Sequence, residues 1–80
     1  MTTEQSQRLV ALCGQALYGD QWQSQLSRAL HVDTRTVQRW ASGKSCPKPG
    51  VWRDVHALLE RNAAELRDCM LELETGVTVE

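Results

Sequence analysis

Two short helix-forming segments separated by only three residues occupy the centre of this 80-residue chain. The first runs from about Gln21 to Leu30, and the second runs from Thr34 to Ser42. Apolar residues recur three or four positions apart in both, which is the period of an α-helix with one buried face. Because the connection His31-Val32-Asp33 is so short, the two helices are expected to cross at a steep angle and to bury their facing side chains together.

Longer helical patterns flank this pair of short segments. The first covers about residues 4–18, with Thr2 or Thr3 able to cap it, and the second covers about residues 50–74, roughly 37 Å if unbroken. Pro49 suits the first position of the later helix, where its missing N–H is of no consequence. Since no strand pattern of useful length occurs, the sequence predicts an all-α fold with four helices, or five if the last one kinks near Asn62.

Turn and cap residues mark where these helices begin and end. Asp20, followed three residues later by Gln23, has the form of a capping box. Asp33 is positioned to cap the helix that begins at Thr34, and Gly43 is expected to end that helix in a left-handed conformation. A chain of this length has room for one core, so we expect a single domain over residues 1–80.

Charge is distributed unevenly along the chain, although its formal total is −1. Residues 23–53 hold six basic residues against Asp33 alone, a net charge of +5. Residues 54–80 hold seven acidic residues against Arg61 and Arg67, a net charge of −5. A basic middle segment points to a polyanionic partner such as nucleic acid.

The central segment carries a recognisable motif. Residues 23–40 read QSQLSRALHVDTRTVQRW, and WASGK follows from Trp40, with Pro47 seven residues past that Trp. This run resembles the signature of the phage-repressor and Cro-like helix-turn-helix family over roughly residues 20–59. His31 stands where the family usually has glycine, and Ala41 stands where an acidic residue often follows the Trp. The resemblance implies a lambda-repressor-like domain with a helix-turn-helix core at about 20–43.

The resemblance implies that the helix from Thr34 to Ser42 enters the major groove of double-stranded DNA. With Val37 and Trp40 turned inward, that helix presents a polar face. Arginine can pair with two acceptors of guanine, and glutamine can pair with adenine in the same bidentate way. The expected base-reading residues are Thr34, Arg35, Gln38, Arg39 and Ser42.

Four further residues are expected to contact DNA phosphates. Gln23 looks like the glutamine with which the family contacts the backbone, and free N–H groups at a helix start favour an anion. Two lysines lie in the loop that follows the reading helix, and an arginine begins the next helix, so they can contact the flanking backbone. These phosphate-contacting residues are Gln23, Lys44, Lys48 and Arg53.

The last helix extends beyond what a helix-turn-helix core needs. Its apolar stripe must be buried somewhere, and a two-fold dimer would cover it while placing two reading helices about 34 Å apart. The alternative is that the helix folds back on its own core in a monomer. The residues expected at the dimer interface are Ala63, Leu66, Cys69, Met70 and Leu73.

Other classes of site find little support. The chain has three cysteines, which cannot all pair internally, and no Cys or His pair has zinc-knuckle spacing, so we expect no metal and no cofactor. The three tryptophans are read as core rather than as stacking platforms for single strands. No secretory signal and no membrane-length apolar run is evident, which predicts a cytoplasmic protein that avoids membranes.

We therefore expect a non-enzymatic, sequence-specific DNA-binding transcriptional regulator, because a core this small rarely carries an active site. Its expected form is a homodimeric repressor that occupies an inverted-repeat operator, controls its own promoter and belongs to a phage or other mobile element. The alternative is an antitoxin, anti-defence or adaptor protein whose last helix binds a protein partner.

Overall fold

The computed structural model describes the backbone of residues 1–79 and the side chains of residues 1–76. Throughout these residues the chain is helical or connecting loop, without strands, so the predicted all-α class is confirmed. Its elements, in order, are α1 (Thr3–Tyr18), the 3-10 turn η1 (Gly19–Gln21), α2 (Trp22–Leu30), α3 (Thr34–Ala41) and α4 (Pro49–Val79).

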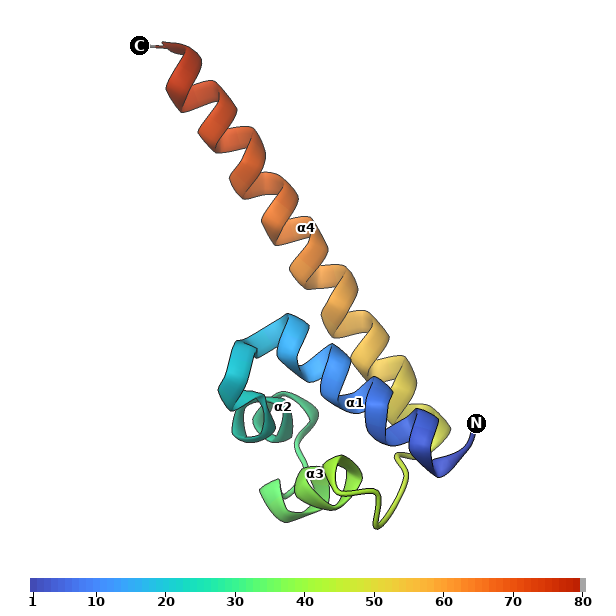
Figure 1. The fold of residues 1–80 in the computed structure, drawn as a ribbon. Helices are drawn as coiled ribbons and strands as arrows, with labels where there is room; N and C mark the ends of the chain where they lie inside the picture. The colour runs from blue at the N-terminus through green and yellow to red at the C-terminus, as the bar shows by residue number, and fades with distance from the viewer. Residues whose placement is uncertain (80) are drawn as a thin grey trace.

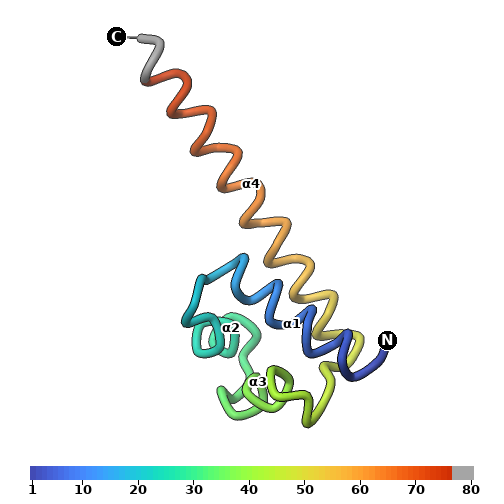
Figure 2. Tube along the Cα trace, in the orientation of Figure 1, coloured from blue at the N-terminus to red at the C-terminus, as the bar shows by residue number. Residues whose placement is uncertain are grey.

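Helices α1, α2 and α3 form a small body on which only the first half of α4 packs (Figure 1). The second half of α4 extends past the end of the body, which gives the molecule dimensions of 53 × 22 × 20 Å. The trace in Figure 2 shows α3 near one end of the molecule and the second half of α4 running toward the other end. The body formed by α1, α2 and α3 and the projecting second half of α4 therefore present two separate surfaces.

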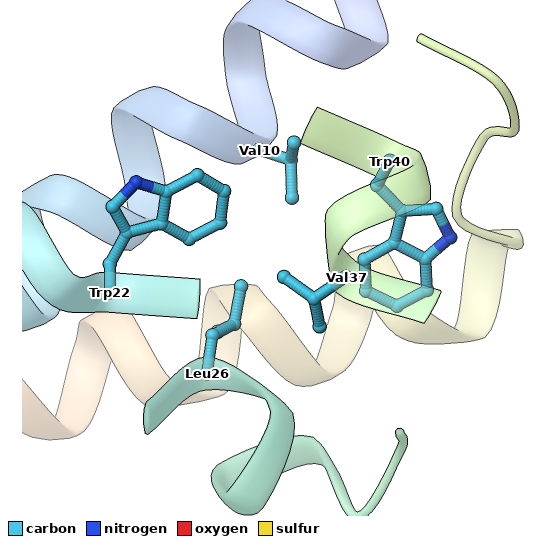
Figure 3. Close-up of a cluster of buried hydrophobic side chains, with 5 residues drawn as sticks. All are labelled: Val10, Trp22, Leu26, Val37 and Trp40. Carbon is cyan, nitrogen blue, oxygen red and sulfur yellow. The ribbon is translucent and has the colours of Figure 1, made fainter. Parts of the chain in front are cut away.

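The core of the body is built from side chains of three helices that converge on one point (Figure 3). Leu26 of α2 and Val37 of α3 are completely buried, and Val10 of α1 lies beside them. Trp22 and Trp40 close the cluster from either side, as expected for indoles that supply the bulk of a core without phenylalanine. Trp52 of α4 is half-buried and packs on the edge of this cluster.

Gly14 permits α1 and α2 to approach closely. A Cβ atom at this position would overlap the indole ring of Trp22. Because glycine has no side chain, the ring can lie flat against the backbone of α1.

The observed start of α1 agrees with the sequence-based prediction, whereas the start of α2 does not. Thr2 caps α1 in a complete capping box, since its hydroxyl accepts from the Gln5 N–H at 3.1 Å and its own N–H donates to Gln5 Oε1 at 2.9 Å. The capping box expected at Asp20 and Gln23 is wrong. The 3-10 turn takes up Asp20, and α2 begins at Trp22 without a side-chain cap, because burial of Trp22 determines where the helix starts.

The later boundaries are close to those expected. Asp33 holds the N-cap position of α3, but its carbonyl and not its side chain accepts from Thr36 and Val37. Helix α3 ends at Ala41, one residue earlier than expected, and Gly43 adopts the predicted positive φ of 80°. Helix α4 starts at Pro49 as expected and then continues without interruption through residue 62 to Val79, past the expected end at residue 74.

None of the helices formed by the described residues is both long and apolar enough to cross a membrane. No group of three or more His, Cys, Asp or Glu side chains gathers among these residues in a way that could hold a metal ion.

Candidate nucleic-acid interface

Helix α3 turns one face into the core and the other toward solvent. Val37 and Trp40 are buried, so the side chains between them, Gln38 and Arg39, must point outward. The outward side chains border an open depression of about 420 Å³. Its lining consists of Arg35, Gln38, Arg39, Ser42 and Lys44. Four of the five predicted base-reading residues and one predicted phosphate contact therefore share one concave surface.

The turn after α3 brings Lys44 to this surface. The Lys44 N–H donates to the Arg39 carbonyl at 2.9 Å, which folds the chain back over the end of the helix. Gly43 permits this reversal of the chain because it adopts a positive φ. The Ser42 hydroxyl donates to the same Arg39 carbonyl at 3.2 Å. Because its one proton is used in this bond, the hydroxyl can only accept a hydrogen bond from an external group.

The cations of the depression are unpaired among the residues that the structure describes. Arg35, Arg39 and Lys44 make no ion pair with any of those residues, and the short contact between His56 Nδ1 and Glu60 Oε1, 2.8 Å, lies on α4. All three cationic side chains are exposed. Their charge is therefore available to an external anion.

The side chain of Gln7 on α1 forms a hydrogen bond to the last residue of α3. Its side-chain amide donates to the Ala41 carbonyl at 2.9 Å, across 34 positions of sequence. A Cβ at Gly43 would lie 2.8 Å from Gln7 Oε1. The absence of a side chain at this glycine therefore also leaves room for the Gln7 amide and its hydrogen bond to Ala41, which we call the Gln7 brace. The sequence pattern assigns no role to Gln7, and nothing in its local spacing signals one.

The turn between α2 and α3 fixes how α3 is presented. His31, which stands where the resembled family usually has glycine, adopts a left-handed conformation with φ 58° and ψ 42°. Its N–H donates to the Arg28 carbonyl at 3.3 Å, and the Val32 N–H donates to the Ser27 carbonyl at 3.0 Å. The carbonyls of Ser27 and Arg28 near the end of α2 are thus satisfied by the turn.

A pair of hydroxyls joins the two helices at this turn. Ser27 is almost fully buried, and its hydroxyl donates to the Ser24 carbonyl at 2.6 Å. Ser27 Oγ and Thr34 Oγ1 lie 3.2 Å apart. Because a serine has one hydroxyl proton and a carbonyl only accepts, Thr34 must be the donor to Ser27. Thr34 is exposed, and toward solvent it can therefore only accept a hydrogen bond.

The remaining four predicted DNA contacts are not part of the lining of the depression. Thr34 is exposed at the start of α3, and Gln23 is half-buried in the first turn of α2. Lys48 is exposed immediately before α4, and Arg53 is exposed in that helix's second turn.

The five predicted dimer residues lie on the projecting half of α4. Ala63, Leu66, Cys69, Met70 and Leu73 are all exposed. Leu66 and Met70 each expose 57% of their surface, and Leu73 exposes 66%. The alternative in which this helix folds back on its own core is therefore wrong for this structure, because α1 ends before it can cover the stripe.

The three cysteines are free thiols in different surroundings. Cys46 and Cys69 are exposed, whereas Cys13 is half-buried on α1. Burial raises the pKa of the Cys13 thiol above its ordinary value, since the buried environment disfavours the thiolate. Cys13 is therefore the least reactive of the three toward alkylating reagents.

Comparison with protein-family models, curated proteins and solved structures gives no match to this chain. The function is accordingly inferred from the geometry and chemistry of the site itself.

Proposed function

We propose that this protein is a sequence-specific double-stranded DNA-binding regulator in which α2 and α3 form a helix-turn-helix unit. The observation that carries the proposal is the gathering of Arg35, Gln38, Arg39, Ser42 and Lys44 on one exposed depression. Further support comes from the absence of ion pairs between its cations and the other described residues, and from the resemblance of residues 23–40 to the phage-repressor and Cro-like family. Helix α3 is the reading helix.

Base recognition follows from the donor patterns on α3. The major groove, about 12 Å wide, admits an α-helix, and each base pair presents a distinct set of donors and acceptors there. Arg35 and Arg39 suit guanine, whereas Gln38 suits adenine. Each such bidentate pair contributes about 1–3 kcal/mol of discrimination against the wrong base.

Phosphate contacts come from the residues around α3. Lys44, Lys48 and Arg53 are exposed cations that can neutralise the flanking backbone. Helix α2 adds a second type of contact at Gln23. No side chain caps the start of that helix, and the start of a helix favours an anion such as a phosphate oxygen.

The mode of regulation that we propose is occlusion of a promoter by a bound dimer. Occupying an inverted-repeat operator requires only the reading surface, presented twice by a dimer. Repression of the protein's own promoter in a phage or mobile element is what the family resemblance implies.

One observation favours a second candidate function. The exposed apolar stripe on α4 is a surface that a different protein can cover, as in an antitoxin, an anti-defence protein or an adaptor. In that case α3 would be dispensable for activity. Replacing Arg35 and Arg39 together with alanine separates the two functions, since a protein-directed activity would survive the double substitution.

The proposal is tested by enrichment of bound sequences from a pool of randomised duplexes. The intact protein should enrich one motif, and Arg39→Ala should lose selection at one position per half-site, with an affinity loss of about 5- to 150-fold for the enriched duplex. Arg61→Ala is the matched control, because Arg61 is an exposed arginine on α4 outside the depression. Failure of the intact protein to enrich any sequence would overturn the proposal.

A further inference from the structure

We propose that the second half of α4 pairs with the same segment of a second copy, with the two helices parallel and in register. The direction of pairing rests on the proposed function, whereas the pairing itself rests on the surface of α4. The occupant of the exposed stripe is thus another molecule of this chain.

The stripe continues an interface that already exists within the molecule. Val51, Val55 and Leu58 of α4 face the body and pack there. Steps of three and four residues carry the same face onward to Leu66 and Leu73, where no element of the body remains to cover it. One side of α4 is therefore apolar over both halves, although only the first half is buried.

The spacing along the exposed half is that of a two-stranded coiled coil. Leu59, Ala63, Leu66, Met70 and Leu73 follow one another at steps of four, three, four and three residues. In this register Leu59, Leu66 and Leu73 occupy the equivalent d positions, and Ala63 and Met70 occupy the a positions.

The charged side chains are arranged to leave this seam free. Glu65, Asp68 and Glu72 fall at the positions that point away from a partner helix. At the flanking positions, a parallel pair sets Asn62 of one copy near Arg67 of the other, and Cys69 near Glu74, so like charges do not meet. The acidic character of α4 is thus compatible with a second copy on the apolar side.

The position of α3 determines the direction of pairing. Helix α3 lies at the opposite end of the molecule from the tip of α4 (Figure 1). A parallel pair places both reading helices at the same end, where one duplex can meet them. An antiparallel pair centred on Leu66 would place the two Pro49 ends about 50 Å apart at opposite ends, since α4 rises about 1.5 Å per residue. That separation does not match adjacent half-sites about 34 Å apart.

The seam is short, so the pairing is expected to depend on protein concentration. It spans about two heptads, less than the three to four that sustain an independent coiled coil. A shared operator raises the effective concentration of the second copy, which favours assembly on DNA.

Cysteine cross-linking tests the pairing and its direction. The starting protein carries Cys13→Ala, Cys46→Ser and Cys69→Ser, with its helicity checked by circular dichroism. Leu66→Cys and Leu73→Cys are then introduced singly, and Asp68→Cys serves as the outward-facing control. Under mild oxidation without DNA, both seam variants should form covalent dimers and the control should not. Cross-linking of only one seam position, or of neither, would overturn the proposal.

A pair of aspartate substitutions provides a second readout. Leu66→Asp should weaken self-association about ten-fold or more in sedimentation, because it places a charge in the seam. Leu71→Asp is the matched control, since Leu71 is equally exposed, at 55%, but lies on the opposite face of α4. Equal association of the two variants would contradict the seam. Both tests are made without DNA, so their failure is distinguishable from a failure to bind specific duplexes.

Discussion

His31 holds the turn between α2 and α3 in a backbone conformation that glycine adopts more readily. Its φ of 58° lies in the left-handed region, which costs a residue with a Cβ about 1–2 kcal/mol. We predict that His31→Gly raises the free energy of unfolding by about 1 kcal/mol, measured by urea denaturation. His31→Ala, which keeps the Cβ, should bring no such gain. A less stable glycine variant would show that the imidazole makes a contribution larger than the strain.

Thr34 combines a structural contact with an expected reading role. Its hydroxyl proton is used by Ser27, so toward a base it can only accept. We therefore predict a preference for a base with an amino group at the facing position, adenine or cytosine. Thr34→Val should remove this base preference and lower the free energy of unfolding by about 0.5–1.5 kcal/mol. Thr34→Ser keeps the hydroxyl and should therefore retain the base preference and the stability. Titration of duplexes that differ at one base pair tests this, and an unchanged preference in the valine variant would contradict it.

Individual side chains differ in how well the sequence predicts them. The outward position of Arg35, Gln38 and Arg39 follows from helical period alone, once Val37 and Trp40 are assigned to the core. The Gln7 brace could not be predicted, because its partner carbonyl is 34 positions away and any exposed glutamine has the same local pattern. The Ser27 and Thr34 contact likewise depends on the turn geometry.

At the scale of elements, the contact between α1 and α2 depends on Gly14. The indole of Trp22 occupies the space that a Cβ would need. We predict that Gly14→Ala destabilises the fold by about 1–3 kcal/mol through overpacking, measured by thermal unfolding. Gly50→Ala is the control, because Gly50 lies in α4 with open space around it, and it should be neutral or slightly stabilising. Equal effects of the two substitutions would exclude overpacking as the cause.

Element boundaries were predictable where local chemistry decides them. Thr2 and Pro49 mark the starts of α1 and α4 through capping and through the missing N–H, both of which are local properties. The start of α2 was not predictable from Asp20, because the tertiary burial of Trp22 overrides the cap. The path of α4 past residue 62 also required the structure, since the same apolar stripe fits a helix that folds back and one that projects.

At the scale of the whole molecule, the basic and acidic segments occupy different ends. The basic segment holds the depression on α3, and the acidic segment forms the projecting half of α4. In the complex that we propose, this separation would keep the acidic helix away from DNA.

Salt dependence follows from this charge arrangement. Binding to a specific duplex should weaken steeply between 50 and 200 mM salt, with a slope of about −0.9 in log–log form for each phosphate that is neutralised. Lys44→Ala should reduce that slope by about one per protomer, whereas Arg61→Ala should leave it unchanged. Fluorescence anisotropy at several salt concentrations measures both slopes, and a flat dependence would contradict phosphate contact.

The central claim, that α3 reads base sequence, is tested most directly by competition. A labelled duplex enriched by the protein is bound at physiological salt and then challenged with the same unlabelled duplex or with a scrambled version of it. We predict that the scrambled competitor must be present at about 1,000-fold higher concentration or more to displace the protein. Displacement at equal concentrations of the two competitors would show that the depression on α3 attracts DNA by charge alone and reads no sequence.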